Sequence, residues 1–199
     1  MILLIAALIA QDKPFDLAAC GRLAQDRDWF PVEKGTTWTY TVGANEITLT
    51  ARGKEKVGDV ECVKFEWSSG GADSQTEYFA VDDKGVSLHK VETWRNETQG
   101  EMSQEPAIPR LRFSTKKGES WEWAAKDGKS KATYTNAGEE EIKVAAGTFT
   151  CIKVHCDAEN EQGKYTVDRW YAKGVGVVKQ VLSLNNETRE LKKFEKPSK

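Results

Sequence analysis

The sequence Lys34-Gly-Thr-Thr-Trp-Thr-Tyr40 returns 83 positions later as Lys117-Gly-Glu-Ser-Trp-Glu-Trp123. In both stretches a Lys-Gly pair precedes aromatic residues at every second position. A two-residue period is typical of a β-strand with one buried face and differs from the helical period. The two stretches therefore predict two strands with the same aromatic face, placed at corresponding points of two similar units.

Three further matches follow in the same order along the chain. They pair Cys62-Val-Lys-Phe65 with Cys151-Ile-Lys-Val154, Tyr78-Phe-Ala80 with Trp170-Tyr-Ala172, and Asn96-Glu-Thr98 with Asn186-Glu-Thr188. The offset drifts by a few residues, as loop insertions would produce. Self-similarity at one period indicates an internal repeat. We expect two diverged copies, residues 29–105 and 106–199, with Pro106-Ala-Ile-Pro109 as the hinge between them because proline interrupts a strand ladder.

Turn-forming residues separate the alternating runs at short intervals, for example at Ser68-Ser-Gly-Gly71, Asp82-Asp-Lys-Gly85 and Lys126-Asp-Gly128. This spacing predicts five or six short strands in each copy. The fold class is therefore all-β and antiparallel, with two tandem repeats forming one long curved sheet or an open barrel. A chain of 199 residues suits one structural domain rather than two.

The N-terminus predicts export. Residues 1–10 form an apolar run that is too short to span a bilayer but has the length of a signal-peptide core. A buried N-terminal strand is the alternative. Residues 11–28 form a separate N-terminal segment, with helical character over 15–27, and no membrane span is expected after signal removal. We expect a periplasmic or extracellular protein. Lipoprotein anchoring at Cys20, in Leu17-Ala-Ala-Cys20, is disfavoured because polar residues separate it from the apolar run.

The four cysteines are Cys20, Cys62, Cys151 and Cys156. An even number in an exported chain permits disulfides, whose pairing the sequence does not fix. Free buried thiols are the alternative, and for Cys156 a core thiol is the favoured interpretation because it alternates with Ile152 and Val154.

Charge and motifs argue against several functional classes. The formal net charge of -2 disfavours nucleic acid as a partner. His89 and His155, the two histidines, lie in strand-like runs without a nucleophile motif, so no catalytic residue is predicted. No metal site or cofactor is predicted, and Asp157–Gly163 is interpreted as a hairpin tip rather than a calcium loop. The protein is expected not to be an enzyme.

A family resemblance rests on Gly147-Thr-Phe-Thr-Cys-Ile-Lys-Val154 and Arg169-Trp-Tyr-Ala-Lys-Gly-Val-Gly-Val-Val-Lys179. Together they resemble a phrase found in exported bacterial proteins of unknown function, which also open with a Phe-Pro…Gly…Trp-x-Tyr segment, matched here by residues 30–40. The resemblance covers most of residues 29–182. Such families look like open β-barrels related in shape to periplasmic lipoprotein carriers, so the resemblance implies an envelope role and an apolar ligand.

Two aromatic pairs at equivalent places are the candidate binding residues: Trp38, Tyr40, Trp121 and Trp123. They either fill the core or line a concave apolar surface that holds a lipid tail or another apolar ligand, or stacks on a sugar ring. The favoured hypothesis is a non-enzymatic exported protein that binds an apolar or amphiphilic ligand on a concave sheet. The alternative is an envelope protein–protein interaction module that uses exposed strand edges.

Overall fold

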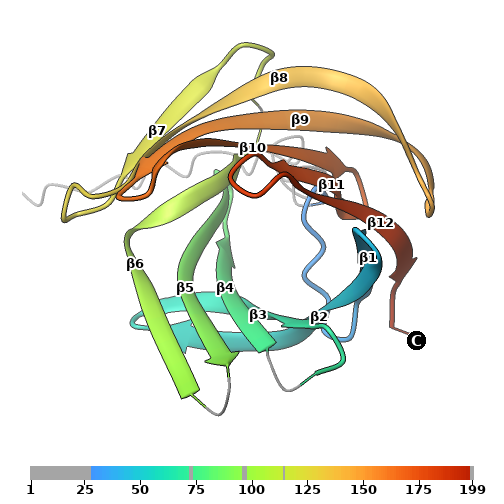
Figure 1. Ribbon diagram of the computed structural model, residues 1–199, viewed down its shortest axis with the longest axis horizontal. Coiled ribbons are helices and arrows are strands. Elements are labelled where there is room, and N and C mark those ends of the chain that lie inside the picture. Colours follow the sequence, from blue (N-terminus) through green and yellow to red (C-terminus); the bar gives the residue numbers. More distant parts are fainter. Residues whose placement is uncertain (1–27, 72–73, 96–97, 114, 198–199) are drawn as a thin grey trace, which may run out of the picture.

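The computed structural model describes residues 28–71, 74–95, 98–113 and 115–197. These residues form one antiparallel sheet, as the alternating pattern predicted, which curves into a nearly closed barrel (Figure 1). The proposed signal peptide, the helical stretch at 15–27 and Cys20 lie outside the described residues. None of the described residues forms a helix that is long and apolar enough to cross a membrane.

The sheet has twelve strands, six on each side of the middle of the chain, in agreement with the predicted number. In chain order they are β1 (Thr37–Val42), β2 (Asn45–Val57), β3 (Val60–Ser68), β4 (Ser74–Val81), β5 (Gly85–Arg95), β6 (Thr98–Arg112), β7 (Ser120–Ala124), β8 (Lys131–Val144), β9 (Gly147–Asn160), β10 (Gly163–Ala172), β11 (Gly176–Leu182) and β12 (Glu187–Glu195).

The first and last strands join the two halves of the sheet. Its order is β6-β5-β4-β3-β2-β1-β12-β11-β10-β9-β8-β7, so each half is a meander of sequential hairpins. Among the described residues, the β1–β12 ladder, in which Trp38 faces Phe194 and Tyr40 faces Leu191, is the only strand ladder that connects the two halves. The sheet's two edges, β6 and β7, are therefore neighbours in sequence.

Side chains of β7 close the gap between these two edges. Trp121 Nε1 donates to the Pro109 carbonyl at 2.8 Å, and Trp123 Nε1 donates to the Pro106 carbonyl at 2.7 Å. One backbone bond, from Lys126 N to Glu105 O at 2.8 Å, adds to them. The seam between β6 and β7 is thus held mainly by indole groups rather than by a strand ladder.

The predicted hinge at Pro106–Pro109 is wrong, because these residues lie within β6. Proline lacks an N–H, and an edge strand tolerates it because one side of that strand needs no ladder donor. Opposite His89, β6 bulges over residues 104–107, where its register with β5 shifts. The chain crosses between the halves after this strand, between β6 and β7.

Both halves begin with the same backbone hydrogen bond, followed by a register shift at a glycine. Gly35 N donates to Ala51 O at 2.8 Å, and Gly118 N donates to Asn136 O at 2.7 Å. Two residues further along β2 and β8 the register shifts at a glycine with positive φ, 109° at Gly53 and 101° at Gly138. The stems of Lys34 and Lys117, the lysines before Gly35 and Gly118, lie over these glycines. A Cβ would be disfavoured by the backbone conformation at both glycines, and at Gly138 also by space, because it would lie 2.8 Å from Lys117 Cδ.

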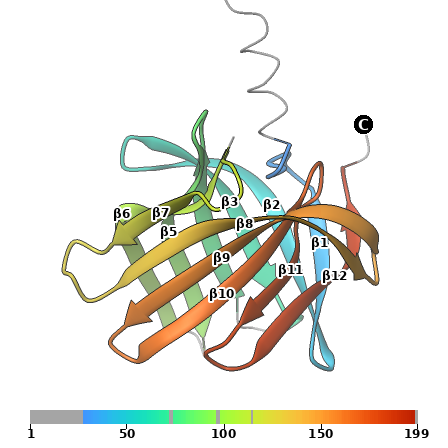
Figure 2. The ribbon, with the colours of Figure 1, turned by 90° about the horizontal axis from the view of Figure 1, so that it is seen from above.

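The two ends of the barrel differ. At the end where the described chain begins, which we call the terminal end, Gly174 N donates to Asp28 O at 2.7 Å. The ring of Phe30 packs there against Phe65 and Phe79, with centroids 5.3 Å away in both cases. At the opposite, distal end lie the β1–β2, β9–β10 and β11–β12 hairpins (Figure 2). Residues 28–32 therefore plug the terminal end.

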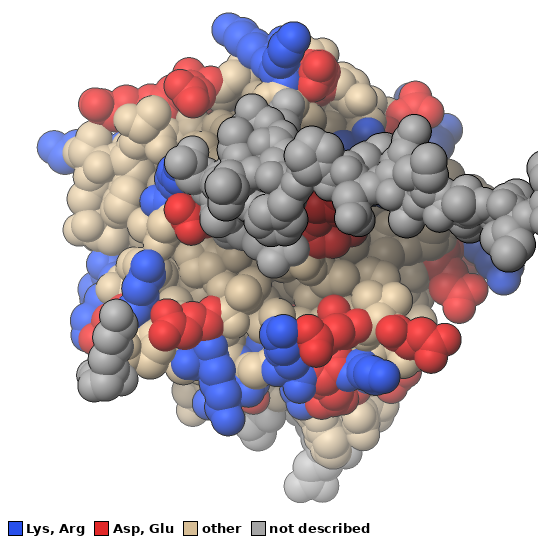
Figure 3. Space-filling model, turned by 180° about the vertical axis from the view of Figure 1, so that it is seen from behind, with Lys and Arg blue, Asp and Glu red and all other residues tan. Residues whose placement is uncertain are grey.

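The end of the barrel seen in Figure 3 carries side chains of Lys and Arg and of Asp and Glu around its margin. Cross-strand pairs include Lys54–Glu61 at 2.6 Å, Lys64–Glu55 at 2.9 Å and Lys131–Glu159 at 3.1 Å. Exposed pairs of this kind contribute little stability because water screens them.

Candidate functional site

The candidate site is a cavity of about 180 Å³ inside the barrel. One wall is aromatic and comes from Phe30 in the plug, Trp38 on β1, Phe65 on β3 and Phe79 on β4. Their rings touch: Trp38 lies 5.8 Å from Phe65 and Phe65 lies 5.7 Å from Phe79, centroid to centroid. This wall offers an apolar surface of the kind that small-molecule pockets use.

The opposite wall is polar. Arg110 from β6, Arg169 and Tyr171 from β10 and Gln180 from β11 line the same cavity. Arg110 lies two residues after Ile108 on β6, and Arg169 lies two residues after Val167 on β10, so these side chains share the inward face of their strands. Polar and aromatic walls facing one cavity create an amphiphilic environment.

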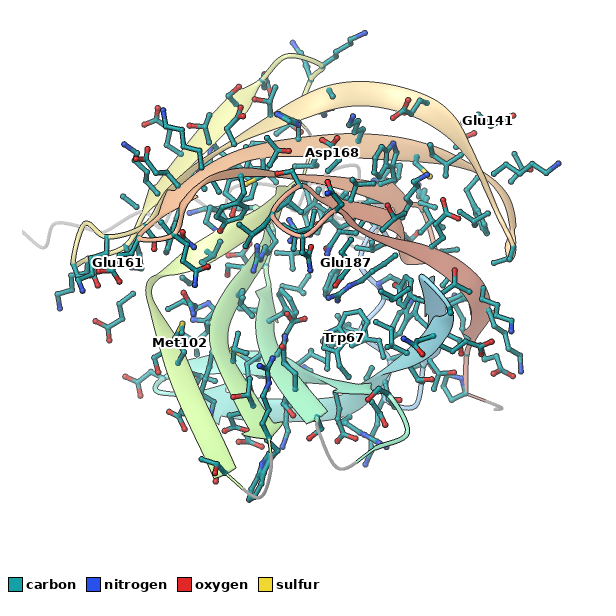
Figure 4. All side chains as sticks on the ribbon, viewed as in Figure 1. Trp67, Met102, Glu141, Glu161, Asp168 and Glu187 are labelled. Carbon is teal, nitrogen blue, oxygen red and sulfur yellow. The ribbon has the colours of Figure 1, made fainter. Side chains whose placement is uncertain are left out.

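Between the two walls, Trp67 and Glu77 form a hydrogen-bonded group. Trp67 points into the space that the strands enclose (Figure 4). Its Nε1 donates to Glu77 Oε2 at 3.0 Å, and Gln75 Nε2 donates to Glu77 Oε1 at 3.1 Å. Arg189 lies over the Trp67 ring at 5.0 Å. Both carboxylate oxygens of Glu77 therefore already have a donor.

The arginines of this cavity differ in their partners. Arg189 Nε lies 2.5 Å from Glu187 Oε1, an ion pair, and Arg169 Nε donates to Gln180 Oε1 at 2.8 Å, a neutral acceptor. Arg110 has no hydrogen bond or ion pair with another described side chain. Burial, and secondly the positive charge of the nearby Arg110, lower the pKa of Arg169 below its ordinary value. Guanidinium groups still stay charged at any physiological pH.

A second cavity of about 210 Å³ adjoins the first, and Arg110, Arg169 and Gln180 line both. Tyr134, Cys156, Val167 and Leu182 complete much of its wall. The second cavity leads toward the distal end, where Trp123 and Tyr165 also line a wider hollow of about 940 Å³. The arginines thus lie between the first cavity, with its aromatic wall, and the second cavity, which leads toward the outside.

Two tyrosines and a cysteine around these arginines are neutral at physiological pH, whereas Glu77, which lines the first cavity with them, raises the pKa of Arg110 by its charge, against the lowering effect of burial. Burial raises the pKa of Tyr134 to about 12 and raises the pKa of Tyr171 above its ordinary value. Burial also raises the pKa of the Cys156 thiol, against the lowering effect of the two arginines. The thiol is therefore not an activated nucleophile, and the tyrosines supply no negative charge.

The four candidate binding residues are placed differently. Trp38 and Tyr40 line the first cavity. Their polar atoms donate to the Val175 and Val177 carbonyls at 2.6 Å and 2.8 Å, which fixes β1 to the start of β11. Trp123 lines the second cavity and the distal hollow, whereas Trp121 stacks on Tyr134 at 5.7 Å. The aromatic pairs are thus partly cavity wall and partly structural support, and their role in binding remains a hypothesis.

The cysteines within the described residues are free thiols: Cys62, Cys151 and Cys156, all buried. The structure therefore forms none of the disulfides that three of the four cysteines could have made with one another. Cys62 and Cys151 occupy corresponding places in β3 and β9, and burial raises the pKa of Cys151 to about 11.

Arg110, Arg169 and Glu77 were missed as candidates from the sequence. The sequence does contain a signal for them. Each is a charged residue at an inward position of a strand, as Arg169 is between Val167 and Tyr171. A charge on the buried side of an alternating strand is unusual unless it serves a site.

The histidines lie apart from the cavities described above. His155 Nδ1 and Asp168 Oδ1 are 2.6 Å apart, and His89 Nε2 is 3.1 Å from Ser87 Oγ. Neither pair lines the two interior cavities. Within the described residues, no group of three or more His, Cys, Asp or Glu side chains is arranged to hold a metal. The Asp157–Gly163 segment forms the β9–β10 hairpin, as expected.

Comparisons with known proteins agree with the fold. The model of a DUF3108-like family matches residues 133–188, from β8 to the start of β12. No curated protein matches the chain. A crystal structure from Bacteroides fragilis, described as that of an exported protein with a YmcC-like fold, has a TM-score of 0.51 at 13% identity and covers 84% of this chain and 98% of its own.

Two further crystal structures are similar at lower scores. One is described as a lipoprotein from Parabacteroides distasonis, with a TM-score of 0.39, 14% identity and coverage of 84% of this chain and 98% of its own. The other is the lipoprotein YmcC from Escherichia coli, with a TM-score of 0.36, 9% identity and coverage of 92% and 93%. The likeness to the first structure shows a shared fold and leaves function to be argued from the site.

Proposed function

We propose that this chain is a non-enzymatic binding protein of the bacterial envelope that holds an amphiphilic ligand inside its barrel. The observation that carries the proposal is a cavity with one aromatic wall, including Phe65 and Phe79, and one polar wall, including Arg169 and Gln180. An amphiphile satisfies both walls, because its apolar part covers the rings and its polar part reaches the hydrogen-bonding groups.

Export supports the same proposal. Residues 1–10 have the pattern of a signal-peptide core, and the Bacteroides fragilis protein of similar fold is described as exported. An envelope protein meets lipids and other amphiphiles that need a shielded environment in water. We place this chain in the periplasm or outside the cell, without requiring an anchor at Cys20.

Native mass spectrometry of the purified protein, with organic extraction of what it carries, tests the proposal. We expect an extra mass that extraction removes, and uptake of the neutral dye Nile red by the emptied protein. Leu49→Trp, which fills the cavity from β2, should abolish uptake. Thr48→Trp, on the other face of β2, is the matched control. An unloaded protein that takes up no dye would contradict the proposal.

A second candidate, an envelope interaction module, is favoured by the edge of β6. β6 has fifteen residues and β7 only five, and the seam bonds reach β6 from Glu105 onward. Within the described residues, Thr98–Gln104 therefore has no strand on its outer edge. Met102 is 64% exposed and nearby Trp94 is 45% exposed. Strand addition at such an edge is a common recognition mode.

Cross-linking from a photoreactive residue at Gln99 in the envelope fraction tests this candidate. A partner captured there, and lost when Met102→Lys is introduced, would favour an interaction role. A cross-linking pattern identical to that of a probe at Asp59, at the terminal end, would argue against it.

A further inference from the structure

We propose that the ligand carries an anionic head group, held between the guanidinium groups of Arg110 and Arg169, with its apolar chain against the aromatic wall. This inference rests on the proposed function and specifies the chemical class of the ligand. It starts from two positive charges that the topology brings together from the two halves of the chain, on β6 and β10.

The first step is the charge balance of the cavity. Among the described residues that line it, the charged ones are Arg110, Arg169, Arg189 and Glu77. Arg189 is already paired with Glu187, and both oxygens of Glu77 accept hydrogen bonds from Trp67 and Gln75. Arg110 and Arg169 are left without an ion-pair partner among the described side chains, a costly arrangement in a low-dielectric interior.

The second step is that the surrounding groups balance the two positive charges only in part. Tyr134, Tyr171 and Cys156 surround the two arginines, and burial keeps all three protonated at physiological pH by raising their pKa values. Burial alone would lower the pKa of Arg110, but neighbouring groups, among them the Glu77 carboxylate, outweigh it and raise that pKa. Glu77 is held by Trp67 and Gln75 and forms no ion pair with either arginine, so an incoming anion would add the direct ion-pair partner that both guanidinium groups lack among the described side chains.

The third step is the geometry of access. Both arginines line the first cavity, which has the aromatic wall, and the second cavity, which leads toward the distal end. A head group held there leaves its chain free to lie against Phe65 and Phe79. Guanidinium groups bind carboxylate, sulfate and phosphate oxygens through paired N–H donors. An anion that bridges the two groups would also relieve their mutual repulsion.

Calorimetric titration with decanoate and decanol, which share one alkyl chain and differ in charge, tests the proposal. We expect the wild-type protein to bind decanoate at least about tenfold more tightly than decanol, as a charge-assisted hydrogen bond would give. Arg110→Met should remove that preference and leave decanol binding within about threefold. Arg52→Met, which removes a charge paired with Glu66 on the outer face, should leave both affinities unchanged.

Each alternative outcome has a distinct meaning. Equal binding of decanoate and decanol by the wild-type protein, insensitive to Arg110→Met, would overturn the anionic head group and leave the proposed function standing. Binding of neither probe would overturn both. If inorganic phosphate binds as tightly as decanoate, the site binds anions without requiring an apolar chain. This result would overturn the proposal of an amphiphilic ligand. Arg110→Lys, which keeps the charge but loses the planar fork, should retain part of the preference and covers the case in which Arg110→Met fails to fold.

Discussion

The outer faces of the two halves are built alike, whereas their inner faces differ. In the first half Lys64 and Lys90 lie over the ring of Tyr78, at 5.6 Å and 4.2 Å from its centroid. In the second half Lys153 and Lys179 lie over the ring of Trp170, at 4.9 Å and 5.8 Å. Both rings also donate to a carboxylate, Tyr78 to Glu92 and Trp170 to Glu140.

On the inner face, corresponding positions carry different residues. Phe65 and Trp67 on β3 correspond to Val154 and Cys156 on β9. The first half therefore supplies the aromatic wall, and the second half leaves room beside Tyr134 and Arg169. The outer face of a curved sheet needs similar side chains throughout to shield it from water. A cavity that binds an amphiphile needs different side chains on its two walls. This contrast supports, as a proposal, two diverged copies whose binding specificity lies on the inside.

The largest effect on stability should come from truncating an aromatic side chain on the inner face. Phe65→Ala should lower the free energy of unfolding by about 3–5 kcal/mol, because it leaves a void among Phe30, Trp38 and Phe79. Val154→Ala, at the corresponding place, should cost only about 2 kcal/mol because fewer buried methyl groups are lost. Urea denaturation measures both. Equal losses would show that the two inner faces contribute alike, contrary to the comparison.

The second prediction concerns the glycines at which the strand register shifts in both halves. Gly53→Ala and Gly138→Ala should each cost about 1–2 kcal/mol, because both glycines have positive φ. The loss at Gly138 should equal or slightly exceed the loss at Gly53, because a Cβ would lie 2.8 Å from Lys117 Cδ at Gly138 but 3.4 Å from Lys34 Cδ at Gly53. Gly71→Ala is the control, since Gly71 is not among the positive-φ glycines and nothing lies within 4 Å of its added Cβ. A loss at one glycine alone would show that the resemblance of the strand starts is superficial.

A smaller, pH-dependent effect should come from the outer face. Burial alone would raise the pKa of Glu92, but hydrogen bonds from Lys90 and Tyr78 outweigh it and the pKa lies below its ordinary value. Glu92 thus contributes stability above the ordinary carboxyl pKa, and this contribution is lost as the pH falls through the lowered folded-state value. Glu92→Gln should cost about 1 kcal/mol near neutral pH and little in acid.

Thermal unfolding followed between neutral pH and about pH 3 measures this difference. Tyr78→Phe, which removes one of the two hydrogen bonds to Glu92, should show a weaker form of the same pH dependence. A Glu92→Gln curve parallel to that of the wild-type protein would contradict the assignment.

The smallest effect concerns the stability of the ligand-free barrel. Arg110→Met should leave its free energy of unfolding within about 1 kcal/mol of the wild-type value, because the removed charge has no described ion-pair partner and repels Arg169, while the charge of Glu77 partly offsets these costs. Arg189→Met should lower it, since this change leaves Glu187 without its partner. A loss of stability beyond that range in both variants, measured on delipidated protein, would mean that Arg110 has a structural role.

Much of the fold was predictable because it depends on local pattern. The two-residue period identified the strand faces, as for Trp38 and Tyr40 on β1. Glycine and aspartate turns located several hairpins, including those at Asp82–Gly85 before β5 and Lys126–Gly128 between β7 and β8. The one clear error, the hinge at Pro106–Pro109, arose because proline marks both linkers and edge strands, and only the pairing of β5 with β6 distinguishes the two.

The sequence by itself therefore determined an all-β chain with an alternating buried face and aromatic strand starts, since each of these follows from residues close together in the chain. Only the tertiary structure decided that β1 pairs with β12, that Trp121 and Trp123 close the β6–β7 seam, and that Arg110 and Arg169 line one cavity. These contacts join residues far apart in sequence through the curvature and register of the whole sheet, and periodicity along a strand carries no information about either.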